Sequence, residues 1–172
     1  MAKIAIGLGL ALAALTALTV LGYFSPGMKP GFITPNLFVS DLNLALQILL
    51  VLGLTVGAWL ARRGNIKAHR VNQTVWVLVN AALVVFMLVP AMSDVKITKV
   101  ADFADVRTAV TWLHATVGTL TVLAGLWLVL QMNNILPVRL HIMGWKKLMR
   151  LTLAGYWAVA IGGIVTYYFW YY

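Results

Sequence analysis

The stretch Arg62-Arg63-Gly64-Asn65-Ile66-Lys67-Ala68-His69-Arg70 decides the fold of this chain. One long apolar run, 42–61, ends immediately before it, and another, 71–92, begins immediately after it. An apolar helix of roughly 20 residues crosses the hydrocarbon core of a bilayer. A short basic stretch between two such runs therefore predicts a tight turn between two membrane-spanning helices, with its charges outside the lipid.

Three further apolar runs bring the number of predicted transmembrane helices to five. The five cover residues 4–24, 42–61, 71–92, 108–132 and 148–172. A signal peptide is rejected for the first run, because it is longer than the usual apolar region of roughly 7–15 residues. No small-x-small cleavage site follows it either, since Gly22-Tyr23-Phe24 stands there.

We expect one all-α integral membrane domain, 1–172, with two parts. Residues 1–39 are an added N-terminal helix and a Pro/Gly-rich external loop, and residues 40–172 are a four-helix core. The core consists of two hairpins of the same sense, because 61–70 and 137–147 are both basic turns with one His. Small residues at helix-packing spacing, Gly9, Ala13 and Ala17, predict close packing between helices, and a docking face on the added helix for another subunit is the alternative.

Composition excludes several classes of protein. With 62% hydrophobic and 10% charged residues, the chain lies outside the range of soluble domains. It has no Cys, which excludes disulfides, thiolate metal sites and Cys-linked haem. No phosphate-binding glycine loop, zinc-protease pair or nucleophile elbow occurs, so we expect no enzyme. The net charge of +9 is confined to short loops beside apolar runs, which argues against nucleic-acid binding.

The charges divide the loops into two groups. One group, with the N-terminus, has nine basic residues and no acidic one: Lys3, Arg62, Arg63, Lys67, Arg70, Arg139, Lys146, Lys147 and Arg150. The other group has four of each sign: Lys29, Lys96, Lys99 and Arg107 with Asp41, Asp94, Asp102 and Asp105. Basic loops face the cytoplasm. We therefore expect a multi-pass protein of a bacterial or archaeal inner membrane, with a cytoplasmic N-terminus and an external, periplasmic C-terminus.

His114 is the main candidate for a functional residue. It lies inside a predicted span, where ionisable residues are functional candidates by default. Helical spacing puts it on one face with the small or polar residues Thr111, Gly118, Thr121 and Gly125. It is either a haem or copper ligand, together with Met87 or another second ligand, or a neutral side chain that hydrogen-bonds between helices. Gln47 and Tyr167 are the candidate partners of its ring, by depth in the membrane.

Two other histidines, His69 and His141, belong to the opposite, basic end. They either meet at the inner face and bind a metal or an anionic cofactor, or face water and lipid headgroups. A transmembrane bis-His haem needs two histidines at matching depth, and His69 and His114 do not meet this condition.

The loop 62–70 resembles the Arg-Arg-Gly-x-x-x-x-His-Arg loop of a small four-helix membrane family of bacteria and archaea. That family includes the CtaM/YozB-like proteins, which are implicated in maturing haem-copper terminal oxidases. Trp112-Leu113-His114 and Lys147-Leu148-Met149-Arg150-Leu151-Thr152 resemble its later helices, and the likeness covers roughly residues 40–170. Pro90-Ala91-Met92 stands where family members often have a further His, so only His69 and His114 correspond to the family's histidines.

The resemblance implies a non-catalytic accessory subunit or assembly factor of a respiratory membrane complex, related to haem-copper oxidases. The alternative is a b-type haem or quinone-associated electron-transfer protein. A transporter is less favoured, because no acidic residue lies within a predicted span to carry coupling protons. Other membrane subunits and the bilayer are the expected partners. No motif demands a cofactor; haem or copper is the candidate, and bound lipid is expected.

Overall fold

The computed structural model describes residues 2–23, 33, 38–88, 102 and 104–172. These residues are almost all helical, and none of them forms a strand. The helices are α1 (Ala2–Tyr23), α2 (Phe38–Arg62), α3 (Ile66–Leu83), the π-helical turn η1 (Val84–Leu88), α5 (Val106–Met132), the 3₁₀ turn η3 (Val138–Leu140) and α6 (Trp145–Tyr171). The expectations for most of the loop 25–41 and for the segment 89–101 lie outside the described residues.

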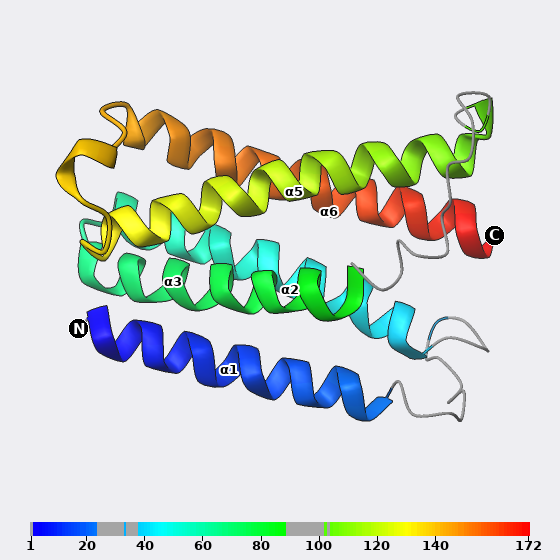
Figure 1. The fold of residues 1–172 in the computed structure, drawn as a ribbon, viewed down its shortest axis with the longest axis horizontal. Coiled ribbons are helices and arrows are strands. Elements are labelled where there is room, and N and C mark those ends of the chain that lie inside the picture. Colours follow the sequence, from blue (N-terminus) through cyan, green and yellow to red (C-terminus); the bar gives the residue numbers. More distant parts are fainter. Residues whose placement is uncertain (1, 24–32, 34–37, 89–101, 103) are drawn as a thin grey trace.

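The long helices lie side by side in a bundle (Figure 1). α3 packs between α2 and α5, and α6 packs against α5 and α2, so these four helices enclose a common interior. α1 packs against α3 on the outside of this group. The N-terminus and the turns of both hairpins lie at one end of the bundle, and the C-terminus lies at the other (Figure 1).

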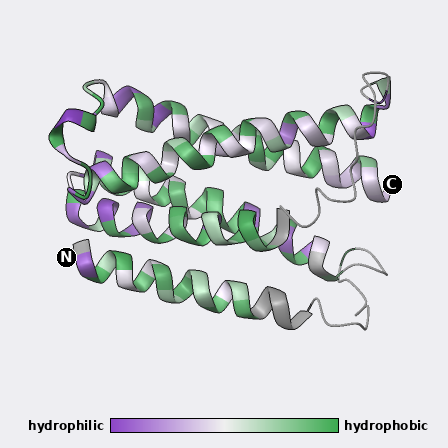
Figure 2. Cartoon of the chain, in the orientation of Figure 1, coloured by the Kyte–Doolittle hydropathy of each residue, from purple (hydrophilic) through white to green (hydrophobic). Residues whose placement is uncertain are grey.

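Three of the helices are long and apolar enough to cross a membrane: Ser40–Arg62, Val106–Met132 and Trp145–Tyr171. Large apolar side chains such as Leu113, Leu120 and Leu151 are more than 60% exposed on them, as expected for a surface in lipid. Figure 2 shows these hydrophobic lengths, with hydrophilic residues gathered at the end that holds the turns.

The other two predicted spans differ from the expectation. The apolar part of α1 among the described residues is the shorter helix Lys3–Leu18. α3 begins at Ile66 rather than at residue 71, so its first turns include Lys67, His69 and Arg70 and dilute its apolar character. The start of α3 is set by Asn65, whose side chain accepts a hydrogen bond from Ala68 N at 3.1 Å.

The turn between α2 and α3 is built from local interactions. Gly64 has φ +78°, a left-handed conformation that favours glycine and reverses the chain after α2. The guanidinium carbon of Arg63 lies 4.1 Å from the centre of the Trp59 ring, which keeps this cation at the end of the bundle. The predicted tight turn is therefore present where the basic stretch begins.

Polar side chains of α3 bind backbone carbonyls of α2. Asn72 Nδ2 donates to Gly53 O at 2.8 Å, and Gln73 Nε2 donates to Leu54 O at 2.9 Å. A β-carbon at Gly53 would overlap the Trp76 ring, and one at Gly57 would overlap the Asn72 and Gln73 amides. The two glycines thus let the helices approach closely enough for these bonds, which satisfy amides away from water.

The small residues of α1 face α3. Ala5 and Ala17 are buried, and a β-carbon at Gly9 would lie 2.7 Å from a methyl carbon of Leu78. The same addition at Gly7 would meet nothing within 4 Å. The stripe of Gly9, Ala13 and Ala17 therefore packs within the chain, which is the first of its two interpretations, and it is not a free docking face. It is occupied by this chain's own α3, because small residues let two backbones approach closely.

Candidate functional site

His114 lies on α5 and faces the paired glycines of α6. A β-carbon at Gly162 would lie 3.0 Å from His114 Nδ1, and one at Gly163 would lie 3.4 Å from its Cε1. The ring therefore sits directly on bare α6 backbone. The predicted inward face of α5 is also present, since Thr111 and Thr121 are buried there together with Gly118 and Gly125.

The same arrangement occurs at two other levels of the α5–α6 contact. A β-carbon at Gly155 of α6 would lie 2.7 Å from Thr121 Oγ1, and one at Gly125 of α5 would lie 2.5 Å from the Tyr156 hydroxyl. At three levels, then, a glycine of one helix makes room for a polar side chain of the other. We call this contact, with its three glycines Gly125, Gly155 and Gly162, the α5–α6 seam.

The polar groups of the seam are only partly paired. Thr121 Oγ1 donates to Val117 O in its own helix at 2.8 Å. His114 Nδ1 and the Tyr156 hydroxyl are buried atoms without a hydrogen-bond partner among the described residues. An unpaired buried polar group costs on the order of 1–3 kcal/mol. The seam is thus a place where a group from outside the described part of the chain would gain a bond.

The end of the bundle near the C-terminus holds a separate polar network. Asp41, in the first turn of α2, is fully buried. One of its oxygens accepts a bond from the Tyr167 hydroxyl, and the other accepts from Ile33 N at 2.6 Å. The hydroxyls of Ser40 and Tyr171 are 2.7 Å apart. These bonds join the start of α2 to the last turns of α6.

Sequence reasoning missed the central role of Asp41 in this network, because Asp41 was placed at a loop border. The available signal was the run of aromatic residues in the tail 167–172. In the structure the Trp170 indole donates to Thr111 Oγ1 at 2.9 Å, so the tail also connects α6 to α5. Polar groups of several tail aromatics therefore point into the protein.

The candidate partners of His114 are placed as follows. The Tyr167 hydroxyl is bonded to Asp41 and has no bond to the ring of His114. Gln47 is half-buried on α2, and in the described part of the chain no hydrogen bond joins it to His114 Nδ1. Met87 falls in η1, and its side chain lies outside the described ones. No cluster of three or more His, Cys, Asp or Glu suited to a metal occurs among the described residues.

The two other histidines line one pocket at the basic end, but each is bonded separately. The ring nitrogen Nδ1 of His69 lies 2.8 Å from Gly57 O. A carbonyl only accepts, so this nitrogen carries the proton and Nε2 is the ring nitrogen left for a ligand. His141 uses its Nε2 on Leu136 O at 3.1 Å. The pocket has a volume of about 690 Å³, and we call it the basic pocket.

The start of α5 is fixed by Asp105. Its carboxylate accepts from the backbone N–H of Thr108 at 2.9 Å and from the Thr108 hydroxyl at 2.8 Å. The hydroxyl bond, followed by the backbone bond, lowers the pKa of this exposed carboxyl below its usual value of 3.8. This cap sets where the helix that holds His114 begins.

No protein-family model matches the chain, and no curated protein and no solved structure matches it significantly. The resemblance of the loop 62–70 to the CtaM/YozB-like family therefore stays a prediction.

Proposed function

We propose that this protein is a non-catalytic integral membrane protein that acts as an accessory subunit or assembly factor of a respiratory or other redox membrane complex. It acts by helix-to-helix contact within the bilayer. The observation that carries the proposal is the buried Nδ1 of His114 on the α5–α6 seam, which has no hydrogen-bond partner among the described residues. In lipid no water replaces a missing partner, so a donor or acceptor from another chain would stabilise it.

The proposal includes five crossings of the membrane. α1 has 22 residues and would extend roughly 33 Å at 1.5 Å per residue, which exceeds the roughly 30 Å core of a bilayer. α3 continues directly into η1, so the segment 66–88 is of similar length. The charge division supports an orientation with the turns in the cytoplasm of a bacterial or archaeal cell and the C-terminus outside.

The residues present suit a shared rather than a self-contained haem or copper site. His114 can supply one ligand, and the bare backbone at Gly162 gives its ring a fixed position. A ligating histidine normally has its second nitrogen bonded, and Tyr167 is engaged by Asp41 instead. Any metal held here would take its remaining ligands from a partner. This supports contact with a redox subunit over a resident electron carrier.

The experiment is purification of the tagged full chain in mild detergent, followed by native mass analysis and an absorption spectrum. We expect a stoichiometric complex with identified respiratory subunits. His114→Ala should reduce recovery of that complex, and His114→Gln should retain part of it because an amide can still hydrogen-bond. The matched control is Thr116→Ala on the exposed side of the same helix. A monomer without partners, or a complex that all three variants leave unchanged, would contradict the proposal.

The absorption spectrum separates the alternative function. A stoichiometric Soret band that disappears in His114→Ala, from a chain purified without partners, would assign the protein as a b-type haem protein instead. Copurified quinone lost in the same variant would assign it as quinone-associated.

A further inference from the structure

The basic pocket lies inside the four-helix group, at the end with the turns. All four core helices line it, and its volume of about 690 Å³ falls within the roughly 300–1,000 Å³ typical of small-molecule sites. Its lining in the described part of the chain includes the cations Arg62, Arg70, Lys146 and Arg150 and no Asp or Glu. The positive charge of these side chains is therefore not neutralised by acidic residues of the pocket, and the pocket favours binding of an anion.

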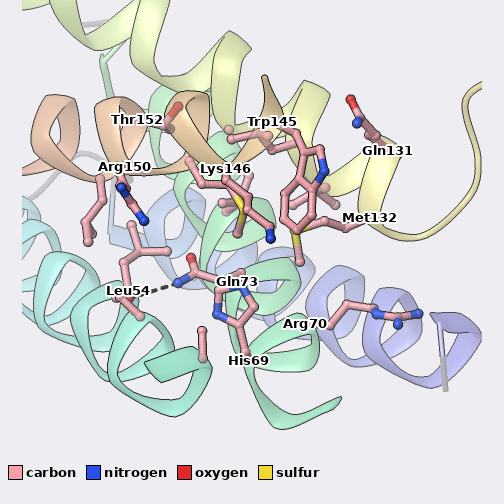
Figure 3. Close-up of a pocket in the computed structure, with 18 of the residues that line it drawn as sticks. Leu54, His69, Arg70, Gln73, Gln131, Met132, Trp145, Lys146, Arg150 and Thr152 are labelled. Carbon is pink, nitrogen blue, oxygen red and sulfur yellow. Dashed lines mark hydrogen bonds between the residues drawn. The ribbon is translucent and has the colours of Figure 1, made fainter. Parts of the chain in front are cut away.

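Figure 3 shows how these side chains lie. Lys146 and Arg150 come from the first turns of α6, and Lys146 extends toward the level of Gln73 and His69 on α3. Arg70 extends away from them. The Gln73 amide is already bonded to Leu54 O, and the His69 ring donates its N–H to Gly57 O, so Nε2 has no proton to donate to an anion. Lys146 and Arg150 are therefore the groups best placed to bind an anionic head.

Deeper in the pocket the lining becomes apolar, with Leu54, Val77 and Leu128 among the buried residues. Two hydroxyls interrupt it. Thr152 is 6% exposed and Tyr156 is 4% exposed, and neither hydroxyl oxygen has a hydrogen-bond partner in the described part of the chain. The Asn80 side chain lies close to the Tyr156 hydroxyl, but no bond of ordinary length joins them. Thr152 is thus the clearer unpaired group.

The order of the cations and the two hydroxyls along α6 indicates the class of ligand. Thr152 and Tyr156 lie about 9 and 15 Å beyond Lys146 along α6 at 1.5 Å per residue. A small hydrophilic anion held by the cations would not reach them and would leave the apolar walls uncovered. A phospholipid has its ester carbonyls directly below its phosphate and an apolar chain below those. Its carbonyls would accept from the two hydroxyls, since a carbonyl oxygen only accepts.

We propose that the basic pocket is a specific site for an anionic phospholipid, with its phosphate between Lys146 and Arg150, its ester region at Thr152 and Tyr156, and its chain between the core helices. The same phosphate chemistry would attract inorganic phosphate, and the experiment separates the two sources. The site belongs to the isolated chain, so it does not depend on the proposed partner complex.

The test is native mass spectrometry of the purified full chain, titrated with phosphatidylglycerol or with phosphatidylcholine of the same acyl chains. We expect at least tenfold tighter retention of phosphatidylglycerol. Lys146→Gln combined with Arg150→Gln should weaken it about 30-fold, because each basic residue near an anionic lipid contributes about fivefold. The matched control is Lys67→Gln with Arg139→Gln, which removes the same charge from the same end of the bundle at residues that do not line the pocket. It should change binding less than twofold.

A second variant tests the depth of the ligand. Thr152→Val preserves shape and removes an unpaired hydroxyl, so folding should be unharmed and lipid retention should fall about two- to tenfold. Equal binding of both lipids, equal effects of the two double variants, or unchanged binding in Thr152→Val would each overturn the proposal. Displacement of phosphatidylglycerol by equimolar inorganic phosphate would also overturn it, because the site would then be one for small anions.

Discussion

Replacing Tyr167 with Phe should destabilise the bundle by about 2 kcal/mol, because it removes a hydrogen bond to a buried carboxylate. Asp41 is fully buried, and the Tyr167 hydroxyl is one of its donors. A bond to a charged group contributes roughly 1.5–3 kcal/mol. The lower part of that range applies here, since Ile33 N still donates to the other oxygen after the substitution.

The matched control is Tyr168→Phe. Tyr168 is the next residue, is 62% exposed and stacks on Tyr172 through its ring, so loss of its hydroxyl should change stability by less than about 0.5 kcal/mol. The assay is equilibrium unfolding in mixed micelles with rising sodium dodecyl sulfate, followed by circular dichroism and by the fluorescence of the seven Trp residues.

A double-mutant cycle with Asp41→Asn then isolates the pair. Tyr167→Phe should cost at least about 1 kcal/mol less in the Asp41→Asn background than in the natural chain, because the charge that needs the bond is gone. The reasoning is refuted if Tyr167→Phe and Tyr168→Phe have equal effects, or if the cycle shows no coupling. Either result would mean that the hydroxyl does not stabilise Asp41.

Three other outcomes are expected. Gly9→Val should displace α1 from α3, seen as loss of cross-linking between cysteines introduced at that contact, whereas Gly7→Val should not; equal cross-linking would contradict the packing of α1. The cap at Asp105 has a lowered pKa, so its contribution should be fully present above pH 3.8 and lost as the pH falls through the lower folded-state value. Asp105→Asn should abolish that acid dependence, measured by amide exchange at the start of α5, and an unchanged acid profile would exclude the cap as its source. Reporter fusions after Trp59 and after Tyr172 should report opposite sides of the membrane, and the same side for both would end the five-span topology.

Much of the helical order could be predicted because apolar runs and basic turns are local features. The turn after α2 is an example. Gly64 acts through its own backbone conformation and Asn65 through a side-chain bond to a residue three positions later, so both effects can be predicted from the sequence. The inward face of α5 was predictable for the same reason, since helical periodicity alone places Thr111 and Thr121 together. The start of α3 was less predictable, because its first turn is polar. The apolar run begins only at residue 71, whereas the helix already begins at Ile66.

The candidate site shows where local features stop being sufficient. His114 was identifiable as an ionisable residue in an apolar run, but its contact with Gly162 depends on how α5 and α6 cross. The bond between Tyr167 and Asp41 joins residues that are 126 positions apart in the sequence, and no local spacing predicts it. The basic pocket is similar, because its cations come from two turns that only the packing of the hairpins brings together.

The sequence by itself determined that this is a helical protein suited to a membrane, with its basic turns at one end, because hydrophobicity, charge and turn chemistry act over a few residues at a time. The tertiary structure alone decided that the small residues of α1 pack on α3, that Asp41 is buried against α6, and that a pocket opens between the basic turns. In lipid the helices gain little from hydrophobic burial against one another. Their arrangement is therefore set by close backbone approach and interhelical hydrogen bonds, which depend on the three-dimensional fit of residues far apart in the chain.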